Sequence, residues 1–314
     1  MKIIKVATRS SPLAMWQARH VAALLEKSGM TVELLPVETT GDKKLEVALS
    51  KIGDKGVFTL ELEQMLLRGE ADIAVHSAKD MPSSLPDGLQ IIAFTERENP
   101  QDVLLSHKAG INLDNQEITV GTASTRRVAT LARYYPIVKT TAVRGNLQTR
   151  IRKMEEGACD ALLLAYAGVH RMGFAGMIRQ NLHTDVFTPA VGQGSLAIEA
   201  ATGLNPQVIA LMANALSDPV TQICVEAERA FLRAMEGGCS VPVFGYARKE
   251  NGKLLLQGGI VSLDGAEEIR MKAETEWPLQ GGNQHREMGK QLAESILNGG
   301  GASILSKIKQ TLHS

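Results

Sequence analysis

The sequence predicts two similarly built α/β units followed by a small α+β unit. Three observations support this prediction. Short β-branched runs alternate with helical patterns early in the chain, the same alternation restarts near residue 119, and after Gly194 two helical patterns precede three alternating runs. Alternating strands and helices are typical of mostly parallel sheets with helices on both faces. The 314 residues suffice for about two domains, or for three small ones.

The first unit opens on an apolar run and a well-marked helix. Ser10 or Ser11 is the expected N-cap of that helix, and Gly29 ends it. In order, we expect a strand at 2–7, a helix at 12–27, a strand at 31–37, a helix at 59–68 and a buried strand at 71–75. The stretch 40–56 contains three glycines among charged residues, which favours a mobile lid.

The second unit repeats the pattern of the first. Residues 6–11 (VATRSS) and 120–125 (VGTAST) each combine a strand end, a hydroxyl-rich turn and a helix start. We expect a strand ending at 119–121, a helix at 124–134, a strand at 138–143, a helix at 147–156 and a strand at 161–164. Such sheets bind ligands at the carboxyl ends of their strands, beside helix N-termini. The repeat therefore predicts a cleft between two α/β units.

The third unit has a different order of elements. We expect helices at 206–216 and 220–235, strands at 241–248, 254–262 and 268–276, and a helix at 284–297. This order fits a small α+β domain with a three-stranded antiparallel sheet. The expected domains are a discontinuous N-terminal α/β domain (1–96 and 195–216), a central α/β domain (97–194) and a C-terminal α+β domain (217–314).

Composition excludes several classes of protein. Hydrophobic residues make up 44% and charged residues 22%, which argues against a disordered chain. Because 34 basic residues balance 34 acidic ones, no overall charge attracts nucleic acid or an anionic membrane. No apolar run reaches the ~18 residues of a membrane span, and no signal-peptide core is present. We therefore expect a cytoplasmic protein, and nothing in the sequence requires more than a monomer.

The segment 76–82 (HSAKDMP) places polar groups directly after the buried strand at 71–75. Ser77, Lys79 and Asp80 therefore stand where open α/β sheets place their sites. Lys79 favours the ionised form of the neighbouring Asp80 carboxylate. An ionised carboxylate suits the stabilisation of a cation, or proton transfer to and from a departing amine. A capped polar turn ended by Pro82 is the open alternative.

A set of basic side chains shares one placement, because each closely follows a predicted strand or opens the next helix. The set comprises Arg9, Lys79, Arg126, Arg127, Arg144, Arg150 and Arg171. Arginine binds carboxylates and phosphates through two parallel hydrogen bonds. The predicted cleft should therefore bind a polyanionic ligand, although solvated arginines at helix ends are the alternative for each one. The phosphate motif GxxxxGK[ST] is absent.

Cysteine and histidine usage narrows the chemistry further. Cys239 lies in 236–242 (EGGCSVP), where glycines suit an accessible thiol on a hinged loop; a helix C-cap is the alternative. Cys159 and Cys224 lie in apolar or helical patterns and are expected to be inert. The histidines show no ligand spacing and no CxxC pair occurs, so we expect no metal site.

Seven segments, taken in order, resemble the porphobilinogen deaminase family, also called hydroxymethylbilane synthases. They are 7–14 (ATRSSPLA), 53–58 (GDKGVF), 76–82 (HSAKDMP), 121–127 (GTASTRR), 143–146 (VRGN), 189–194 (PAVGQG) and 237–242 (GGCSVP). The resemblance implies two periplasmic-binding-protein-like α/β domains around a cleft, plus a small third domain. It also implies a transferase of tetrapyrrole biosynthesis that joins four porphobilinogen molecules head to tail into linear hydroxymethylbilane, with release of ammonia.

The resemblance further assigns roles to residues. The family builds its product on a dipyrromethane cofactor held by a thioether to one cysteine, which by position is Cys239. Asp80 matches the catalytic carboxylate, which assists ammonia loss, stabilises the azafulvenium cation and helps to deprotonate the new ring. Lys55 and Phe58 match a lid over the cleft. The positions that match contacts with cofactor or chain carboxylates are Arg9, Ser77, Lys79, Ser124, Arg126, Arg127, Arg144, Arg150 and Arg171.

A non-catalytic, two-lobed anion-binding module of the periplasmic-binding-protein type is the alternative interpretation. Two lobes and a basic cleft would describe it equally well. It would not need Cys239 in a glycine-rich loop, however, so the sequence favours the deaminase. Porphobilinogen, a small molecule, is the expected partner.

Overall fold

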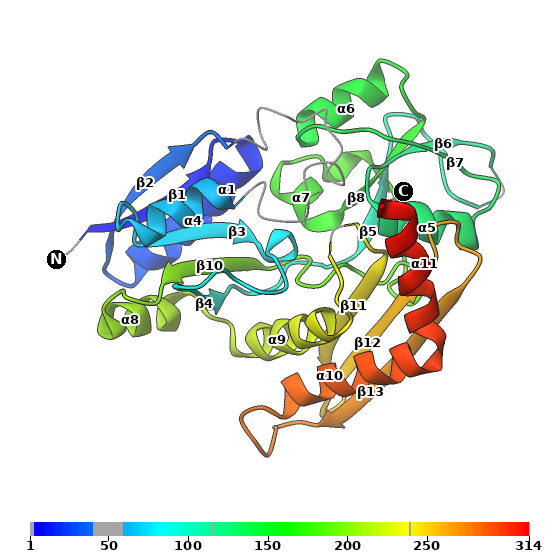
Figure 1. Cartoon of the computed structure of the whole chain (residues 1–314). Coiled ribbons are helices and arrows are strands. Elements are labelled where there is room, and N and C mark those ends of the chain that lie inside the picture. Colours follow the sequence, from blue (N-terminus) through cyan, green and yellow to red (C-terminus); the bar gives the residue numbers. More distant parts are fainter. Residues whose placement is uncertain (1–2, 40–58, 115, 239, 314) are drawn as a thin grey trace.

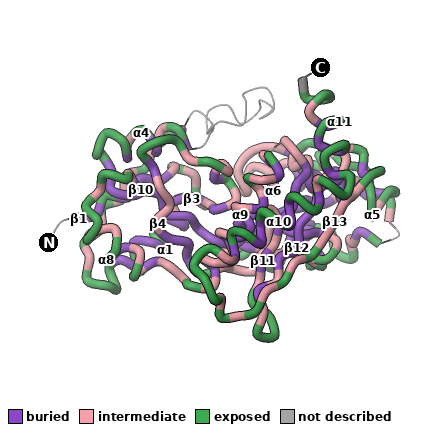
Figure 2. The backbone as a smooth tube through the Cα atoms, turned by 60° about the horizontal axis from the view of Figure 1, so that its bottom comes forward, coloured by how far each residue is buried: buried purple, intermediate pink, exposed green. Residues whose placement is uncertain are grey.

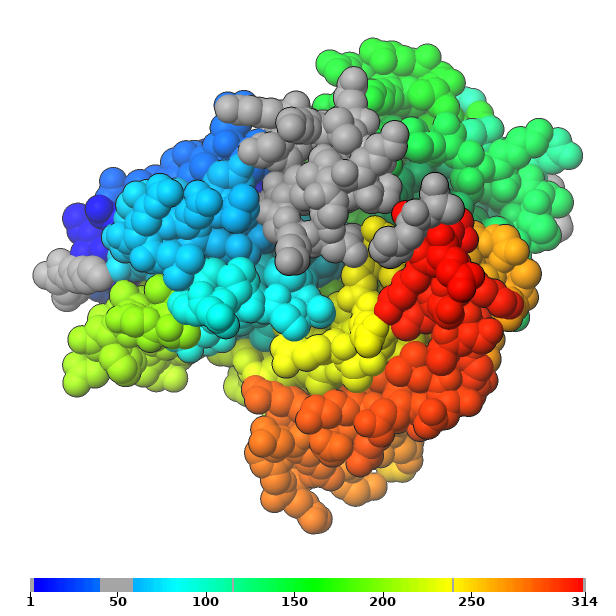
Figure 3. Space-filling model, in the orientation of Figure 1, coloured from blue at the N-terminus to red at the C-terminus, as the bar shows by residue number. Residues whose placement is uncertain are grey.

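The computed structural model describes residues 3–39, 59–114, 116–238 and 240–313 of the chain. Figure 1 shows three parts, each built on its own sheet: a blue-to-cyan part that also includes the yellow-green residues 196–216, a teal-to-green part, and a yellow-to-red part. We call them the N-terminal, central and C-terminal parts. The C-terminal part lies against both others (Figure 3), and it donates hydrogen bonds to Pro82 of the first and accepts them from Arg133 of the second.

The N-terminal sheet has the strand order β2-β1-β3-β10-β4. Its strands are β1 (Ile3–Arg9), β2 (Thr31–Val37), β3 (Ile73–Ser77), β4 (Leu89–Phe94) and β10 (Leu196–Ala201). β10 runs antiparallel to both of its neighbours, whereas β1, β2 and β3 are parallel. Helices α1 (Pro12–Lys27) and α8 (Pro206–Leu216) contact each other over the sheet, and α4 (Leu60–Leu67) packs on it separately.

Alternation along β1 divides the N-terminal core between two faces. Val6 belongs to the cluster that contains Val21 of α1, whereas its neighbour Ala7 belongs to the cluster that contains Leu62 of α4. Successive side chains of a strand point to opposite faces, so a sheet covered on both sides needs apolar residues at consecutive positions. Figure 2 shows this as strands that are buried along most of their length. The mostly apolar sequence of β1 follows from this arrangement.

The central sheet repeats the topology of the N-terminal sheet, with the order β7-β6-β8-β5-β9. Its strands are β5 (Asp102–Leu105), β6 (Thr119–Gly121), β7 (Lys139–Thr141), β8 (Ala161–Ala165) and β9 (Ile178–Asn181). β6 is parallel to β7 and β8, and β5 is antiparallel to β8 and β9. Its helices are α5 (Thr125–Tyr134), α6 (Leu147–Glu155) and α7 (Tyr166–Arg171). The fourth strand of each sheet, β10 in the N-terminal part and β5 in the central part, is the first strand that the chain forms after it crosses from the other part.

The C-terminal sheet is antiparallel, with the order β11-β12-β13. Its strands are β11 (Val243–Glu250), β12 (Lys253–Val261) and β13 (Glu268–Glu276), and its helices are α9 (Pro219–Ala234), α10 (Gln284–Ile296) and α11 (Ala302–His313). Asp218 caps α9 by accepting from the Thr221 amide at 2.7 Å. Phe231 of α9 fills the core, and a Cβ on Gly258 of β12 would lie 2.7 Å from its ring. The helix can therefore approach the sheet closely only because glycine stands there.

The predicted fold class is confirmed, with two α/β sheets and a small α+β part. The sequence missed strands β4, β5, β9 and β10 and helices α7 and α11. The strand expected at 138–143 is limited to Lys139–Thr141. No single helix in the described ranges is long and apolar enough to cross a membrane, and α8 and α9, which pass that test only together, meet at a bend of 104°.

Candidate functional site

The turn that carries Asp80 follows β3 directly. A 3-10 turn, Ala78–Asp80, leaves Ala78 buried and Asp80 exposed. Gly192, at φ +73°, packs on this turn so closely that a Cβ there would lie 2.9 Å from the Ala78 Cβ. The segment 189–194 therefore holds the turn from one side. On the other side, Arg229 of α9 donates to the carbonyl oxygen of Pro82 at 2.8 Å.

A small pocket of about 30 Å³ joins Asp80 to residues of two strand ends. Arg9 is the last residue of β1 and Ser77 the last residue of β3, so both strands extend further than the sequence predicted, and both residues line the pocket. Gln17 of α1 lines it too and donates to the Ser77 hydroxyl at 2.9 Å. Gln17 was missed because a glutamine inside an amphipathic helix carries no sequence signal. The pocket presents an anion, a cation and hydrogen-bonding groups to one small volume.

Arg126 and Arg127 are buried in the first turn of α5, where they share one carboxylate. The Arg127 Nη2 donates to Asp102 Oδ1 at 2.8 Å, and the Arg126 Nη2 lies 2.9 Å from Asp102 Oδ2. Burial alone would raise the pKa of Asp102, but the two guanidinium groups outweigh burial and hold that pKa below its usual range. Asp102 therefore stays ionised. It was missed because it follows an Asn-Pro turn and meets its partners only in the folded chain.

Lys79 lies in an environment that disfavours its charged form. Its ammonium group donates to Gln193 Oε1 at 3.3 Å. Burial and the charge of Arg127 lower the pKa of Lys79 to about 8, although the Asp80 and Asp102 carboxylates act in the opposite direction. Arginines of the central part thus lower the pKa of a lysine in the N-terminal part. An anionic ligand would relieve this repulsion.

Arg144 and Arg150 flank the N-terminus of α6. The Arg150 Nε donates to the Gly145 carbonyl oxygen at 2.7 Å, and Gly145 has φ +122°, which favours glycine. Burial and the charge of Arg127 lower the pKa of Arg150, Asp80 acts in the opposite direction, and Arg144 lowers it further. The structure therefore brings Arg127, Arg144 and Asp80 within electrostatic range of Arg150.

Ser124 and Arg171 are placed less directly. Ser124 is the N-cap residue of α5 but makes no side-chain cap hydrogen bond. Arg171 ends α7 rather than opening a helix; it donates to the Gly194 carbonyl oxygen at 2.7 Å, and its guanidinium lies 5.3 Å from the ring centroid of Trp16. These contacts connect α7 to α1 and to the segment 189–194. Carboxylate binding by either residue stays a prediction.

The cysteines divide as predicted for the two that the structure describes. Cys159 and Cys224 are buried, and burial raises the pKa of the Cys224 thiol to about 12, so neither suits covalent chemistry at neutral pH. Lys55, Phe58 and Cys239 lie outside the described residues. Within the described ranges, no group of three or more His, Cys, Asp or Glu side chains could hold a metal ion.

Comparison with known proteins places this geometry in context. Residues 4–207 match the family model described as "Porphobilinogen deaminase, dipyromethane cofactor binding domain", and residues 222–298 match "Porphobilinogen deaminase, C-terminal domain". The porphobilinogen deaminase of Cytophaga hutchinsonii is 51% identical over 312 residues, covering 99% of this chain and 98% of that protein. The porphobilinogen deaminase of Desulfosudis oleivorans is 47% identical over 309 residues, covering 98% of each chain.

Among solved structures, the methionine-binding protein MetQ is similar over 68% of this chain and 89% of its own. The sequence identity is 12% and the TM-score 0.43. The fold class follows from the strand orders described above.

Proposed function

The chain belongs to the porphobilinogen deaminase family, and on that premise we propose how its residues carry out the reaction. The enzyme is a transferase of porphyrin biosynthesis that joins four porphobilinogen molecules into linear hydroxymethylbilane and releases ammonia at each addition. The observation that carries the proposal is the exposed Asp80 carboxylate beside cations whose pKa values are lowered. The family match favours this function over a non-catalytic anion-binding module.

The residues present fit the family's dipyrromethane cofactor. When bound, this group supplies the pyrrole carbon to which the first substrate is joined, and its acetate and propionate side chains are anions. Burial, and then the charge of Arg127, lowers the pKa values of Lys79 and Arg150, so bound anions would stabilise the charged forms of both groups. In addition, Arg127 Nε is buried and has no hydrogen-bond partner within the described residues. A buried donor of this kind is costly unless a ligand or water satisfies it.

We assign the binding of cofactor and chain carboxylates to the set predicted from the sequence. The set consists of Arg9, Ser77, Lys79, Ser124, Arg126, Arg127, Arg144, Arg150 and Arg171. Asp102 supports the pair Arg126 and Arg127 by neutralising part of their charge, so that both can be buried together. Cys239 is the proposed attachment point of the cofactor, and Lys55 and Phe58 are the proposed lid.

Asp80 is the proposed catalytic residue. Each addition breaks the bond between the aminomethyl carbon and the departing amine and forms one carbon–carbon bond between two pyrrole rings. An ionised carboxylate stabilises the positive charge that the substrate develops as ammonia leaves. The same carboxylate then accepts the proton that the newly joined ring must lose. Asp80 is exposed and lines the pocket, so its carboxylate is accessible for both tasks.

The remaining features of the proposal concern organisation. We propose the domains 1–96 with 195–216, 97–194, and 217–314; the membership of β10 in the N-terminal sheet supports the discontinuous first domain. A monomer acting in the cytoplasm, without nucleic acid or membrane, stays a prediction. Native mass measurement of the purified protein and fractionation of cells test it, because a dimer or membrane-bound protein would contradict it.

Replacement of Asp80 by asparagine tests the proposed role. Asp80→Asn removes the charge but keeps the shape, so we expect turnover to fall by about 10²- to 10⁴-fold. The protein should still fold and carry its cofactor, as read from thermal unfolding and intact mass. Asp87→Asn, which changes an exposed carboxylate seven residues away, is the matched control. Near-normal turnover of Asp80→Asn would overturn the assignment.

A further inference from the structure

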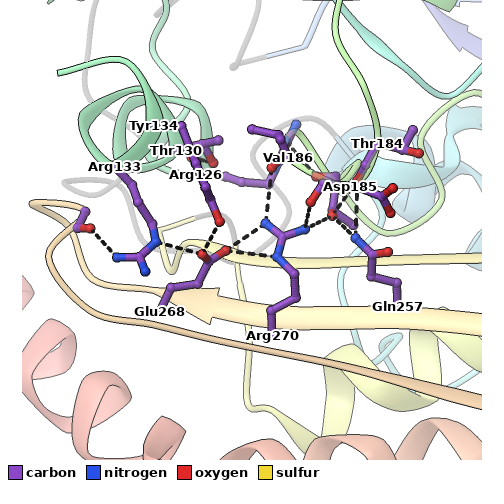
Figure 4. Close-up of polar contacts among 12 residues, drawn as sticks. Arg126, Thr130, Arg133, Tyr134, Thr184, Asp185, Val186, Gln257, Glu268 and Arg270 are labelled. Atoms are coloured by element: carbon purple, nitrogen blue, oxygen red, sulfur yellow. Dashed lines mark hydrogen bonds and ion pairs between the residues drawn. The ribbon is translucent and has the colours of Figure 1, made fainter. Parts of the chain in front are cut away.

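The hairpin β12–β13 of the C-terminal part holds the last turn of α5 (Figure 4). The Arg133 Nε lies 2.8 Å from a carboxylate oxygen of Glu268, and the Tyr134 hydroxyl donates to that same carboxylate. Arg133 also donates to the carbonyl oxygens of Gly265 and Ala266 at 3.1 Å each. A Cβ on Gly265 would lie 2.7 Å from the Arg133 backbone nitrogen, so the hairpin turn and the helix are in direct contact.

Arg270, two residues further along β13, holds the segment 185–188 of the central part. Its guanidinium donates to the Thr188 hydroxyl at 2.5 Å and to the Val186 carbonyl oxygen at 3.1 Å. It is itself fixed by Glu268, to which it donates at 2.7 and 3.1 Å, and it lies 4.4 Å from the ring centroid of Phe244. Figure 4 shows Glu268 and Arg270 side by side, so one carboxylate connects both contacts.

The segment 185–188 leads back to the first turn of α5. Arg126 donates to the Thr188 carbonyl oxygen at 2.9 Å. The Thr188 hydroxyl accepts from Gln257 of β12 at 2.6 Å as well as from Arg270. Thr188 is almost fully buried, so little else competes for these groups. Both ends of α5 are therefore bound by the C-terminal sheet, the last turn directly and the first turn through Thr188.

We propose that Glu268 and Arg270 are positioning residues that set the orientation of α5, and with it the direction in which Arg126 and Arg127 face the site. This inference rests on the proposed function, in which those arginines bind carboxylates of the growing chain. The C-terminal part also contains Cys239, by sequence the proposed cofactor attachment. The contacts of Glu268 and Arg270 thus fix the position of Arg126 and Arg127 relative to the C-terminal part, in which Cys239 would carry the cofactor.

The ion pairs of Glu268 are less exposed than ordinary surface ion pairs. Exposed pairs contribute little, because water competes and the side chains lose entropy. The Glu268 side chain is only 6% exposed, and it pairs with Arg133 of the central part and with Arg270 of the C-terminal part. On the same strand, Glu274 pairs with Lys253 in an exposed position within the C-terminal sheet, and it offers a matched control.

Two substitutions test the proposal on the cofactor-loaded enzyme. Glu268→Gln removes the charge, and Arg270→Lys keeps the charge but loses the planar fork that reaches Thr188, Val186 and Glu268 together. We expect the KM for porphobilinogen to rise about tenfold, which corresponds to about 1.4 kcal/mol of binding. Cofactor content by intact mass should stay unchanged. Native mass spectrometry after limiting substrate should show more enzyme with one or two added pyrroles than in the wild type.

Hydrogen exchange provides the second readout, and it does not depend on turnover. Amides of α5 should exchange faster in both variants than in the wild type and in Glu274→Gln. A KM and an intermediate distribution equal to those of the wild type would overturn the proposal, even if the variants unfold at lower temperature. Unchanged exchange in α5 would overturn it as well. Failure of the wild type to consume porphobilinogen would instead contradict the proposed function, and the exchange result would still decide the placement of α5.

Discussion

Lys79 donates a hydrogen bond to Gln193 Oε1 at 3.3 Å, and the amide nitrogen of the same Gln193 donates to Asp102 at 2.9 Å. The side chain of Gln193 thus connects Lys79, in the turn that carries Asp80, to Asp102, the carboxylate that pairs with Arg126 and Arg127. It also donates to the Pro100 carbonyl oxygen at 2.7 Å, so it spans the crossing between the N-terminal and central parts. Gln193 is 1% exposed, which leaves water little part in this connection.

Gln193→Met should lower kcat/KM for porphobilinogen by about 10- to 100-fold. Methionine has a similar volume but neither accepts from Lys79 nor donates to Asp102, and each lost hydrogen bond to a charged group costs about 1.5–3 kcal/mol. Steady-state kinetics measure the effect. Gln180→Met, which removes a glutamine that caps a loop of the central part away from the site, is the control. Equal kcat/KM in the two variants would argue against the connection.

The lowered pKa of Lys79 predicts a pH dependence of substrate binding. With a pKa of about 8, half of the ligand-free molecules have a neutral Lys79 at that pH. A bound carboxylate favours the ammonium form, so binding takes up a proton and the KM should rise as the pH increases from about 7 to about 9. In Lys79→Arg the side chain stays charged, so this rise should disappear. The prediction fails when both proteins give the same KM profile.

The lowered pKa of Lys79 also predicts that the stability of the fold increases with pH, whereas substrate binding weakens. The pKa of Lys79 is lower in the folded protein than its ordinary value of 10.5, so the ammonium form destabilises the fold below about pH 8. This cost is relieved as the pH rises from about 8 through 10.5. Lys79→Met should therefore raise the free energy of unfolding at pH 7 by on the order of 1–2 kcal/mol. Denaturant titrations at pH 7 and near pH 10 measure it, and a gain that does not shrink with pH would contradict the explanation.

Glu228 predicts a large loss of stability on neutralisation. Its carboxylate accepts from both Arg97 Nη atoms at 2.7 and 2.9 Å and from the amides of Gly192 and Ala247 at 2.7 Å each. Glu228→Gln leaves the Arg97 charge buried without its partner, which typically costs 3–5 kcal/mol. Chemical denaturation measures the loss. Glu250→Gln, at an exposed pair with Arg248, should change stability by less than about 1 kcal/mol.

Much of the fold could be predicted because its helices and parallel strands repeat a local pattern. Ser11, one of the two expected N-caps of the first helix, accepts from the Ala14 amide at 3.4 Å, and β13 has the predicted bounds. The strands that were missed are those entered after a crossing or paired antiparallel at an edge. β10, for example, reads LAIEAA, in which Glu199 is the one charged residue, and so short a run is not distinguishable from a buried helix segment by periodicity.

The site could be predicted in part, because strand ends are local features of sequence. Arg9 ends β1, Ser77 ends β3, Asp80 lies in the turn after β3, and all three line one pocket. Asp102 and Gln193 could not be found in this way, because their roles arise from contacts 25 and 91 residues apart in the chain. Asp102 acquires its role only when β5 and α5 meet in the folded central part, and Gln193 only when it meets Lys79 of the N-terminal part.

The intact mass of the purified protein tests the central claim most directly, namely that this chain carries a dipyrromethane primer on Cys239. We expect a mass excess of one dipyrromethane in the wild type and in Cys224→Ser, whose thiol is buried, and none in Cys239→Ser. An excess that persists in Cys239→Ser would contradict the attachment. A wild type that shows no excess, and gains none on incubation with porphobilinogen or preformed hydroxymethylbilane, would contradict the account as a whole.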